Sequence, residues 1–355
     1  MLFKIVALII MSTGFSFFFT YLVIRLSSKK VVGQGERNRA LHSDFVPRSG
    51  GIALIVSFLF GLGLMKILNF SHKPLTEFIL LYLPLSIIVF LGVYDDLKGA
   101  NAIQKLFFQC VCALFVYHFS FQIRYLSFPF IGSIRLGRLA PFVTVIWIVL
   151  LINAFNLIDG LDGLLSRIAL YASLSFLFVF YHRHDMVMAL VFVLIASILA
   201  GFLYWNLYPA KVFLGDTGSM FLGFVFAVFS IYSSQKSSVA FSLSIPLVIL
   251  IIPIVETVTS FLRRLANGKS PFKADFEHIH YKLLNRFESH KRASFVLSSL
   301  SGLFSALGTI FIFVGVKYRT LLVLIVIVGV TLLFFYGSRK GRENFHNAKS
   351  SQPFS

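Results

Sequence analysis

Two adjacent aspartates, Asp95 and Asp96, follow a long apolar run, and Lys98 and Lys105 come shortly after them. Neighbouring carboxylates repel each other unless a cation or a proton relieves the repulsion. The pair therefore predicts a site at the end of a membrane helix that shares Mg²⁺, a lysine ammonium or a proton. A solvated charge cluster at a helix end is the alternative.

A second polar segment ends another apolar run and has a polar side chain at every third position: Asn153, Asn156, Asp159 and Asp162. If the helix continues through this segment, these side chains form one polar stripe. A polar stripe on a membrane helix is costly unless it meets a ligand, a metal ion or water. The alternative is a plain turn, which Gly160 and Gly163 would also permit.

Asp216 lies in the motif Gly215-Asp216-Thr217-Gly218-Ser219, just before a further apolar run. A carboxylate there can bind Mg²⁺, and the backbone amides at a helix start can bind phosphate. A helix N-cap is the commoner role for an isolated aspartate at such a position.

Two further segments contain side chains that can meet an anion. Arg48 precedes Gly50 and Gly51, where the first backbone donors of a helix would be free, although a generic basic loop would look the same. His278 and His280 are two residues apart and would diverge on a helix, so a shared metal ion is not expected. In a loop both can donate to a phosphate or a sugar; an ordinary pair of surface histidines is the alternative.

Apolar runs position all of these motifs. The chain has 355 residues, of which 57% are hydrophobic and 13% charged, whereas soluble domains carry roughly 25% charge. This composition excludes a soluble fold and predicts an all-α polytopic membrane protein. About eleven spans are expected, or ten if one of the last two lies flat on the membrane: 2–26, 51–69, 78–94, 105–121, 140–156, 164–181, 186–205, 219–234, 239–261, 293–316 and 320–337.

These spans predict a single membrane domain over residues 1–337, followed by a basic, disordered cytoplasmic tail over 338–355. Residues 122–138 are rich in aromatic and β-branched side chains and contain glycines, which predicts a small extracytoplasmic hairpin. The net charge of +18 fits basic cytoplasmic loops facing anionic lipid, so nucleic acid is not an expected partner.

Charge counts predict the orientation. With the N-terminus outside, 22 of the 32 basic residues lie in the cytoplasm, which is the usual bias of membrane proteins. On the same side lie 12 of the 14 acidic residues, although acidic residues do little to set topology. We therefore expect a plasma (inner) membrane protein whose active site faces the cytoplasm.

Taken in order, the motifs resemble those of the polyprenyl-phosphate N-acetylhexosamine-1-phosphate transferase superfamily, glycosyltransferase family 4. The resemblance extends from about Arg37 to Arg286. Within the superfamily, Arg263-Arg264 and the His278 loop resemble the UDP-N-acetylglucosamine branch rather than the muramoyl-pentapeptide branch. Tyr281 stands where the former branch usually has another histidine.

The resemblance implies a Mg²⁺-dependent phosphotransferase, with Mn²⁺ as the alternative ion. Polyprenyl phosphate, here undecaprenyl phosphate, would attack the β-phosphorus of a UDP-sugar, most often UDP-N-acetylglucosamine, and release UMP. The lipid product would initiate an envelope glycan such as lipopolysaccharide O-antigen. Homodimers are frequent in the superfamily.

Roles carry over by match to the family's motifs. Catalytic roles are implied for Asp95, Asp96, Asp159, His278 and His280. Metal ligation is implied for Asp216, Asp159 and Asn156. Substrate binding is implied for Arg48, Lys105, Asn156, Asp162, Asn206 and Phe213, with Asn206 and Phe213 at uracil.

Several alternatives remain open on the sequence. Asp95 either attacks the UDP-sugar itself or only deprotonates and positions the lipid phosphate, and we favour the second route. The sugar could be another UDP-N-acetyl sugar. An ion-coupled transporter would also use intramembrane acids, but near the bilayer midplane. A CDP-alcohol phosphotransferase would gather its carboxylates in one short segment, whereas here three separated segments carry them.

Sidedness can be tested by thiol labelling in intact cells. In a background without Cys110 and Cys112, cysteines at Ser43 and Lys269 should resist an impermeant reagent added from outside, while a cysteine at Ser237 should react. Outside labelling at Ser43 or Lys269 would contradict a single cytoplasmic chemical face.

Overall fold

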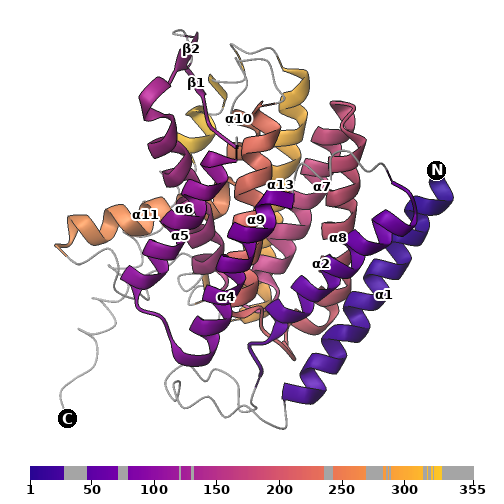
Figure 1. Cartoon of the computed structure of the whole chain (residues 1–355). Coiled ribbons are helices and arrows are strands. Elements are labelled where there is room, and N and C mark those ends of the chain that lie inside the picture. Colours follow the sequence, from indigo (N-terminus) through magenta and orange to yellow (C-terminus); the bar gives the residue numbers. More distant parts are fainter. Residues whose placement is uncertain are drawn as a thin grey trace, which may run out of the picture.

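The chain forms a bundle of helices in the computed structural model (Figure 1). The structure describes residues 1–27, 46–70, 79–119, 121–128, 132–235, 243–268 and 289–314, together with short pieces between 283 and 329. The helices are α1 (Leu2–Ser27), α2 (Gly50–Ile67), α4 (Tyr82–Lys98), α5 (Ala102–His118), α6 (Ala140–Ile158), α7 (Leu164–His182), α8 (Met186–Asn206), α9 (Gly215–Gln235), α10 (Ser244–Ile249), α11 (Ile251–Ala266) and α13 (His290–Ile310).

Seven of the described helices are long and apolar enough to cross a membrane: α1, α2, α6, α7, α8, α9 and α13. Helix α5 is apolar but shorter. The expectation of an all-α polytopic membrane protein is thereby confirmed. Most of the expected span 320–337 and all of the tail 338–355 lie outside the described residues, so the count of eleven and the domain limits stay predictions.

Helix α9 is the centre of the bundle. It packs against α2, α4 and α6, and all of its residues except Asp216 and Gln235 are buried. Glycines allow its neighbours to come close at its N-terminal end. A Cβ at Gly51 of α2 would lie 2.2 Å from the Gly218 nitrogen, and one at Gly92 of α4 would lie 2.5 Å from the Thr217 Cα.

The expected span 239–261 is wrong in detail, because the structure divides it into α10 and α11 at Leu250. Proline has no N–H, so Pro253 cannot donate to the Ile249 carbonyl one turn earlier. The Ser305 hydroxyl of α13 donates to that carbonyl instead, at 3.1 Å. Helix α11 then runs out sideways from the bundle (Figure 1).

The expected hairpin is present, and its extracytoplasmic location stays a prediction. Strands β1 (Tyr125–Phe128) and β2 (Gly132–Arg135) pair antiparallel, with Tyr125 opposite Arg135 and Phe128 opposite Gly132. The hairpin lies at the same end of the bundle as the chain's N-terminus (Figure 1). A hydrogen bond of 3.0 Å from the Ile123 N–H to the Thr144 hydroxyl ties the preceding segment to α6.

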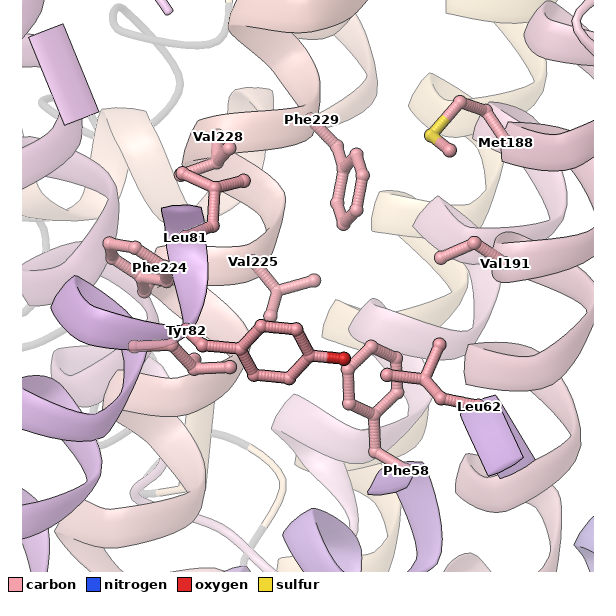
Figure 2. A pocket seen from close by; sticks show the side chains of 11 residues that line it. Phe58, Leu62, Leu81, Tyr82, Met188, Val191, Phe224, Val225, Val228 and Phe229 are labelled. Carbon is pink, nitrogen blue, oxygen red and sulfur yellow. The ribbon is translucent and has the colours of Figure 1, made fainter. Parts of the chain in front are cut away.

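An apolar cavity of about 60 Å³ lies between α2, α4, α8 and α9 (Figure 2). Aliphatic and aromatic side chains line it, and the Tyr82 hydroxyl is the polar group that Figure 2 shows there. On α9 the lining begins at Phe224, eight residues and therefore about 12 Å beyond Asp216. The cavity is thus separate from the polar motifs, which lie at the helix ends.

We predict that Gly51→Ala destabilises the protein by about 1–3 kcal/mol, the usual cost of overpacking. The added methyl would meet the backbone of α9 rather than a movable side chain. Gly63→Ala on the same helix is the control, since a Cβ there meets nothing within 4 Å. Thermal unfolding in detergent measures both; equal melting temperatures would show that α2 can move away from α9.

Candidate active site

Four helix ends lie at the end of the bundle opposite the hairpin (Figure 1), and their polar side chains meet there. They come from the C-terminal ends of α4 and α6 and from the N-terminal ends of α5 and α9, and hydrogen bonds join them across the chain. The sequence-predicted residues Asp95, Asp96, Lys105, Asn156 and Asp216 are all in this cluster. The structure therefore brings motifs far apart in sequence into one site.

Asp96 binds the start of α9 with both carboxylate oxygens. Its Oδ1 accepts from the Asp216 N–H at 2.8 Å, and its Oδ2 accepts from the Thr217 N–H at 2.9 Å and the Thr217 hydroxyl at 2.6 Å. Gly215 makes room for this contact: its φ is +69°, and a Cβ there would lie 2.7 Å from Asp96 Oδ2. These first amides of α9 are therefore occupied, and the phosphate-binding role expected for them is not supported.

Lys105 provides the positive charge of the cluster. Its ammonium donates to Asp216 Oδ2 at 2.6 Å and forms an ion pair with Asp95 Oδ2. The other oxygen of Asp95 accepts the Ala100 N–H at 2.6 Å. Asn101 and Gln104 form a capping box at the start of α5, which fixes the first turn of that helix and thus the base of the lysine side chain.

Asn156 approaches Asp216 from α6. Its Nδ2 donates to Asp216 Oδ1 and to the Ser219 hydroxyl, both at 3.0 Å. An ionised carboxylate only accepts hydrogen bonds, so the amide must present its nitrogen here. A metal ion would be bound by the oxygen of this amide, whereas the nitrogen is the atom that faces Asp216. In the arrangement that the structure shows, Asn156 therefore orients Asp216.

One turn deeper, Asn153 joins α6 to α5. Its Nδ2 donates to Gln109 Oε1 and to the Val149 carbonyl, each at 2.7 Å. Gln109 is four residues after Lys105 and therefore on the same face of α5. Gln109 is not among the site residues expected from the sequence; its spacing from Lys105 is the signal that would have found it.

Asp159 follows the last residue of α6, Ile158, so the polar stripe does not continue as a helix. Burial, together with the nearby Asp96 and Asp162 carboxylates, raises the pKa of Asp159 to about 7, against the opposing effect of Arg48. A bound cation would favour its charged form.

The described residues contain no group of three His, Cys, Asp or Glu side chains placed to hold a metal ion together. Mg²⁺ does not need such a group, because it is usually bound through one or two carboxylates together with phosphate oxygens and water. Asp95 and Asp216 share one cation, the Lys105 ammonium. This pair fits an ion whose other ligands come from a phosphorylated substrate.

Comparison with known proteins shows the family of this chain. Residues 78–234 match the model of glycosyl transferase family 4. A probable undecaprenyl-phosphate N-acetylglucosaminyl 1-phosphate transferase of Bacillus subtilis is 33% identical over 85% of this chain and 83% of its own length. An undecaprenyl-phosphate alpha-N-acetylglucosaminyl 1-phosphate transferase of Thermotoga maritima is 32% identical over 93% of this chain and 97% of its own.

The chain belongs to glycosyl transferase family 4. A phospho-N-acetylmuramoyl-pentapeptide-transferase of Listeria monocytogenes is also similar, at 29% identity over 78% of this chain and 88% of its own length. The family model and the Bacillus and Thermotoga relatives confirm the resemblance to the superfamily and to its N-acetylglucosamine branch.

Two of the family-motif residues are buried and hold the backbone in place. Asp162 Oδ2 accepts the Ala210 N–H at 2.9 Å. The Asn206 amide accepts from the Ser166 hydroxyl at 2.7 Å and donates to the Val212 carbonyl at 2.9 Å. Both side chains are less than 5% exposed. They support the segment between α8 and α9. Contact of Asn206 with uracil stays a prediction, and this buried, hydrogen-bonded geometry does not favour it.

Arg48 and Phe213 lie on two neighbouring segments at the edge of the site. Arg48 is exposed and Phe213 is half-buried, so both are accessible to a ligand. The N–H groups of Gly50 and Gly51 donate to the Phe213 and Leu214 carbonyls at 2.9 and 2.8 Å. The expectation that these glycines leave free backbone donors is therefore wrong, because the segment before α9 uses them.

The histidine loop, with His278 and His280, lies outside the described residues. Its predicted role toward the diphosphate or the sugar stays a prediction. The same holds for Tyr281.

We predict that Asp96→Ala lowers the free energy of unfolding by about 1–3 kcal/mol, because it leaves buried donors at the start of α9 without an acceptor. Thr217→Val removes one of the three hydrogen bonds and should cost less. Chemical denaturation in detergent gives both values. An Asp96→Ala protein as stable as the wild type would mean that Asp96 serves chemistry rather than the position of α9.

Proposed function

We propose that the protein transfers N-acetylglucosamine 1-phosphate from UDP-N-acetylglucosamine to undecaprenyl phosphate and releases UMP. The observation that supports the proposal most strongly is the cluster of Asp95, Lys105, Asn156 and Asp216 at one end of a membrane-spanning bundle. The names of the Bacillus and Thermotoga relatives support the acceptor lipid and the sugar. The product would start a lipid-linked envelope glycan.

The reaction suits this set of side chains because both substrates are anions. An oxygen of the lipid phosphate attacks the β-phosphorus, the bond from that phosphorus to the oxygen bridging it to the α-phosphorus breaks, and UMP leaves with the bridging oxygen. Lys105 and the exposed Arg48 provide positive charge for the phosphates. Asn156 holds Asp216 in place through a hydrogen bond.

The proposal includes Mg²⁺, with Mn²⁺ as a substitute, held by Asp216 and Asp95 together with substrate phosphates, and with Asp159 nearby. Such an ion would neutralise charge on the diphosphate as it is cleaved. Asp159 is suited to this setting because its burial makes it favour a cation or a proton.

Direct attack by the lipid phosphate is favoured over a covalent intermediate on Asp95. One oxygen of Asp95 accepts the Ala100 N–H, and the other is paired with Lys105. A carboxylate bound at both oxygens is a poor nucleophile, whereas the lipid phosphate is already an anion and needs orientation. In the proposed role, Asp95 binds a cation rather than attacking phosphorus.

The location and assembly follow the same proposal. The site would lie in the plasma membrane and face the cytoplasm, the compartment in which UDP-sugars are made. Two copies of the chain would form a dimer. A transporter is less well supported, because the described carboxylates of the site lie at the end of the bundle rather than at its middle.

The test is a membrane assay in which several UDP-sugars are offered with undecaprenyl phosphate and the lipid product is weighed by mass spectrometry. We expect a product with N-acetylhexosamine 1-phosphate, formed best from UDP-N-acetylglucosamine. Asp216→Asn should lower turnover by a factor of about 10² or more, the scale of losing one preorganised electrostatic contact, because an amide cannot neutralise a cation. Near wild-type turnover in folded Asp216→Asn would remove Asp216 from the reaction.

A further inference from the structure

The Lys105 ammonium lies where a divalent ion would be expected. It contacts Asp216 Oδ2 at 2.6 Å and Asp95 Oδ2 in the same position. The Asp95 side chain is only 6% exposed, and its Oδ2 has no hydrogen bond of regular geometry within the described part of the chain. A buried carboxylate oxygen in this state requires a cation, and the lysine is the cation that the structure shows.

The lysine is nevertheless able to leave. Its side chain is 22% exposed, so a path to solvent exists, and its flexible four-carbon stem bears a compact charge. The helix that carries it is fixed separately by the capping box of Asn101 and Gln104. Movement of the ammonium therefore needs rotation of one side chain and no change of the backbone.

We propose that Lys105 is an exchangeable counter-ion. While no divalent ion is bound, its ammonium neutralises Asp95 and Asp216 and holds them together. A divalent ion takes over both carboxylates and displaces the ammonium, which then turns toward solvent. The last step rests on the proposed function: the released ammonium binds the substrate diphosphate, so that ion and lysine act on the same anion in succession.

An exchangeable counter-ion and a permanent salt bridge differ in how the loss of Lys105 changes stability and ion binding. If the salt bridge is permanent, loss of Lys105 lowers stability under all conditions. It then raises the affinity for the ion no more than loss of any other nearby positive charge does. In an exchange, the wild-type lysine competes with the ion. Its removal strengthens ion binding and makes the stability of the protein depend on the ion.

The experiment measures Mn²⁺ binding by the full-length protein in detergent, using the electron paramagnetic resonance signal of free Mn²⁺, and melting temperature in EDTA and in Mn²⁺. Lys105→Gln should bind Mn²⁺ at least about tenfold more tightly than the wild type. It should also melt lower in EDTA and recover in Mn²⁺. Lys98→Gln is the matched control: it removes the same charge from the same end of the bundle, but the Lys98 ammonium lies over the Tyr94 ring and has no ion pair with either aspartate among the described residues.

The proposal is overturned if Lys105→Gln binds Mn²⁺ no more tightly than the wild type, or if Lys98→Gln gains as much affinity. Purification with Mn²⁺ present protects the variant, because on this proposal the ion replaces the lysine. A Lys105→Gln protein that does not fold even with Mn²⁺ also contradicts the exchange. Neither measurement uses a sugar nucleotide or a lipid, so failure of the exchange and failure of the proposed transfer reaction are distinguished.

Discussion

The hydrogen bonds from the first turn of α9 to the Asp96 carboxylate organise the whole site. Helix α9 is buried along nearly its full length, and the N–H groups of its first turn have no partner within the helix and need acceptors. A carboxylate is the best acceptor there, because it also interacts favourably with the helix dipole. Once α4 provides it, Asp216 is fixed beside the end of α4, and Asp95 and Lys105 are brought within contact of it.

Other polar contacts in the bundle follow the same constraint. Where Pro253 frees the Ile249 carbonyl, Ser305 donates to it. At the far end of α9, Arg183 donates to the carbonyl and hydroxyl of Ser233, so a basic residue satisfies the C-terminus just as an acidic one satisfies the N-terminus. Polar side chains inside this membrane bundle thus mostly bind backbone groups, and the site differs in having carboxylates that bind a cation.

Much of this could be predicted from the sequence. Apolar runs predicted most of the described helices to within a few residues, apart from the span that divides into α10 and α11. The composition of residues 122–138 predicted the hairpin, and the order of the polar motifs predicted the family. Convergence of those motifs on one end of the bundle followed from their positions at the ends of successive spans. Burial was harder to predict, because Asp162 and Asn206 have the residue types of a ligand site yet are consumed by the Ala210, Ser166 and Val212 groups around them.

The break between α10 and α11 also needed the structure. From the sequence, 239–261 is expected as one span, and the Ser305 hydroxyl that makes the break tolerable at Leu250 comes from a helix distant in the sequence. Likewise, the pairing of Asn153 with Gln109 depends on how α5 and α6 face each other. Contacts between helices that are far apart in sequence are set by packing, and a single sequence does not contain them in readable form.

The adjacent aspartates illustrate how packing assigns roles that residue type leaves open. Successive residues on an α-helix point about 100° apart, so two neighbouring carboxylates leave the helix in different directions. Asp96 faces α9 and binds its backbone, whereas Asp95 faces α5 and binds Lys105. The pair is therefore not one dyad sharing a proton. Because Asp96 fixes the helix that carries Asp216, it acts on the cation site through position, and Asp95 acts on it by contact.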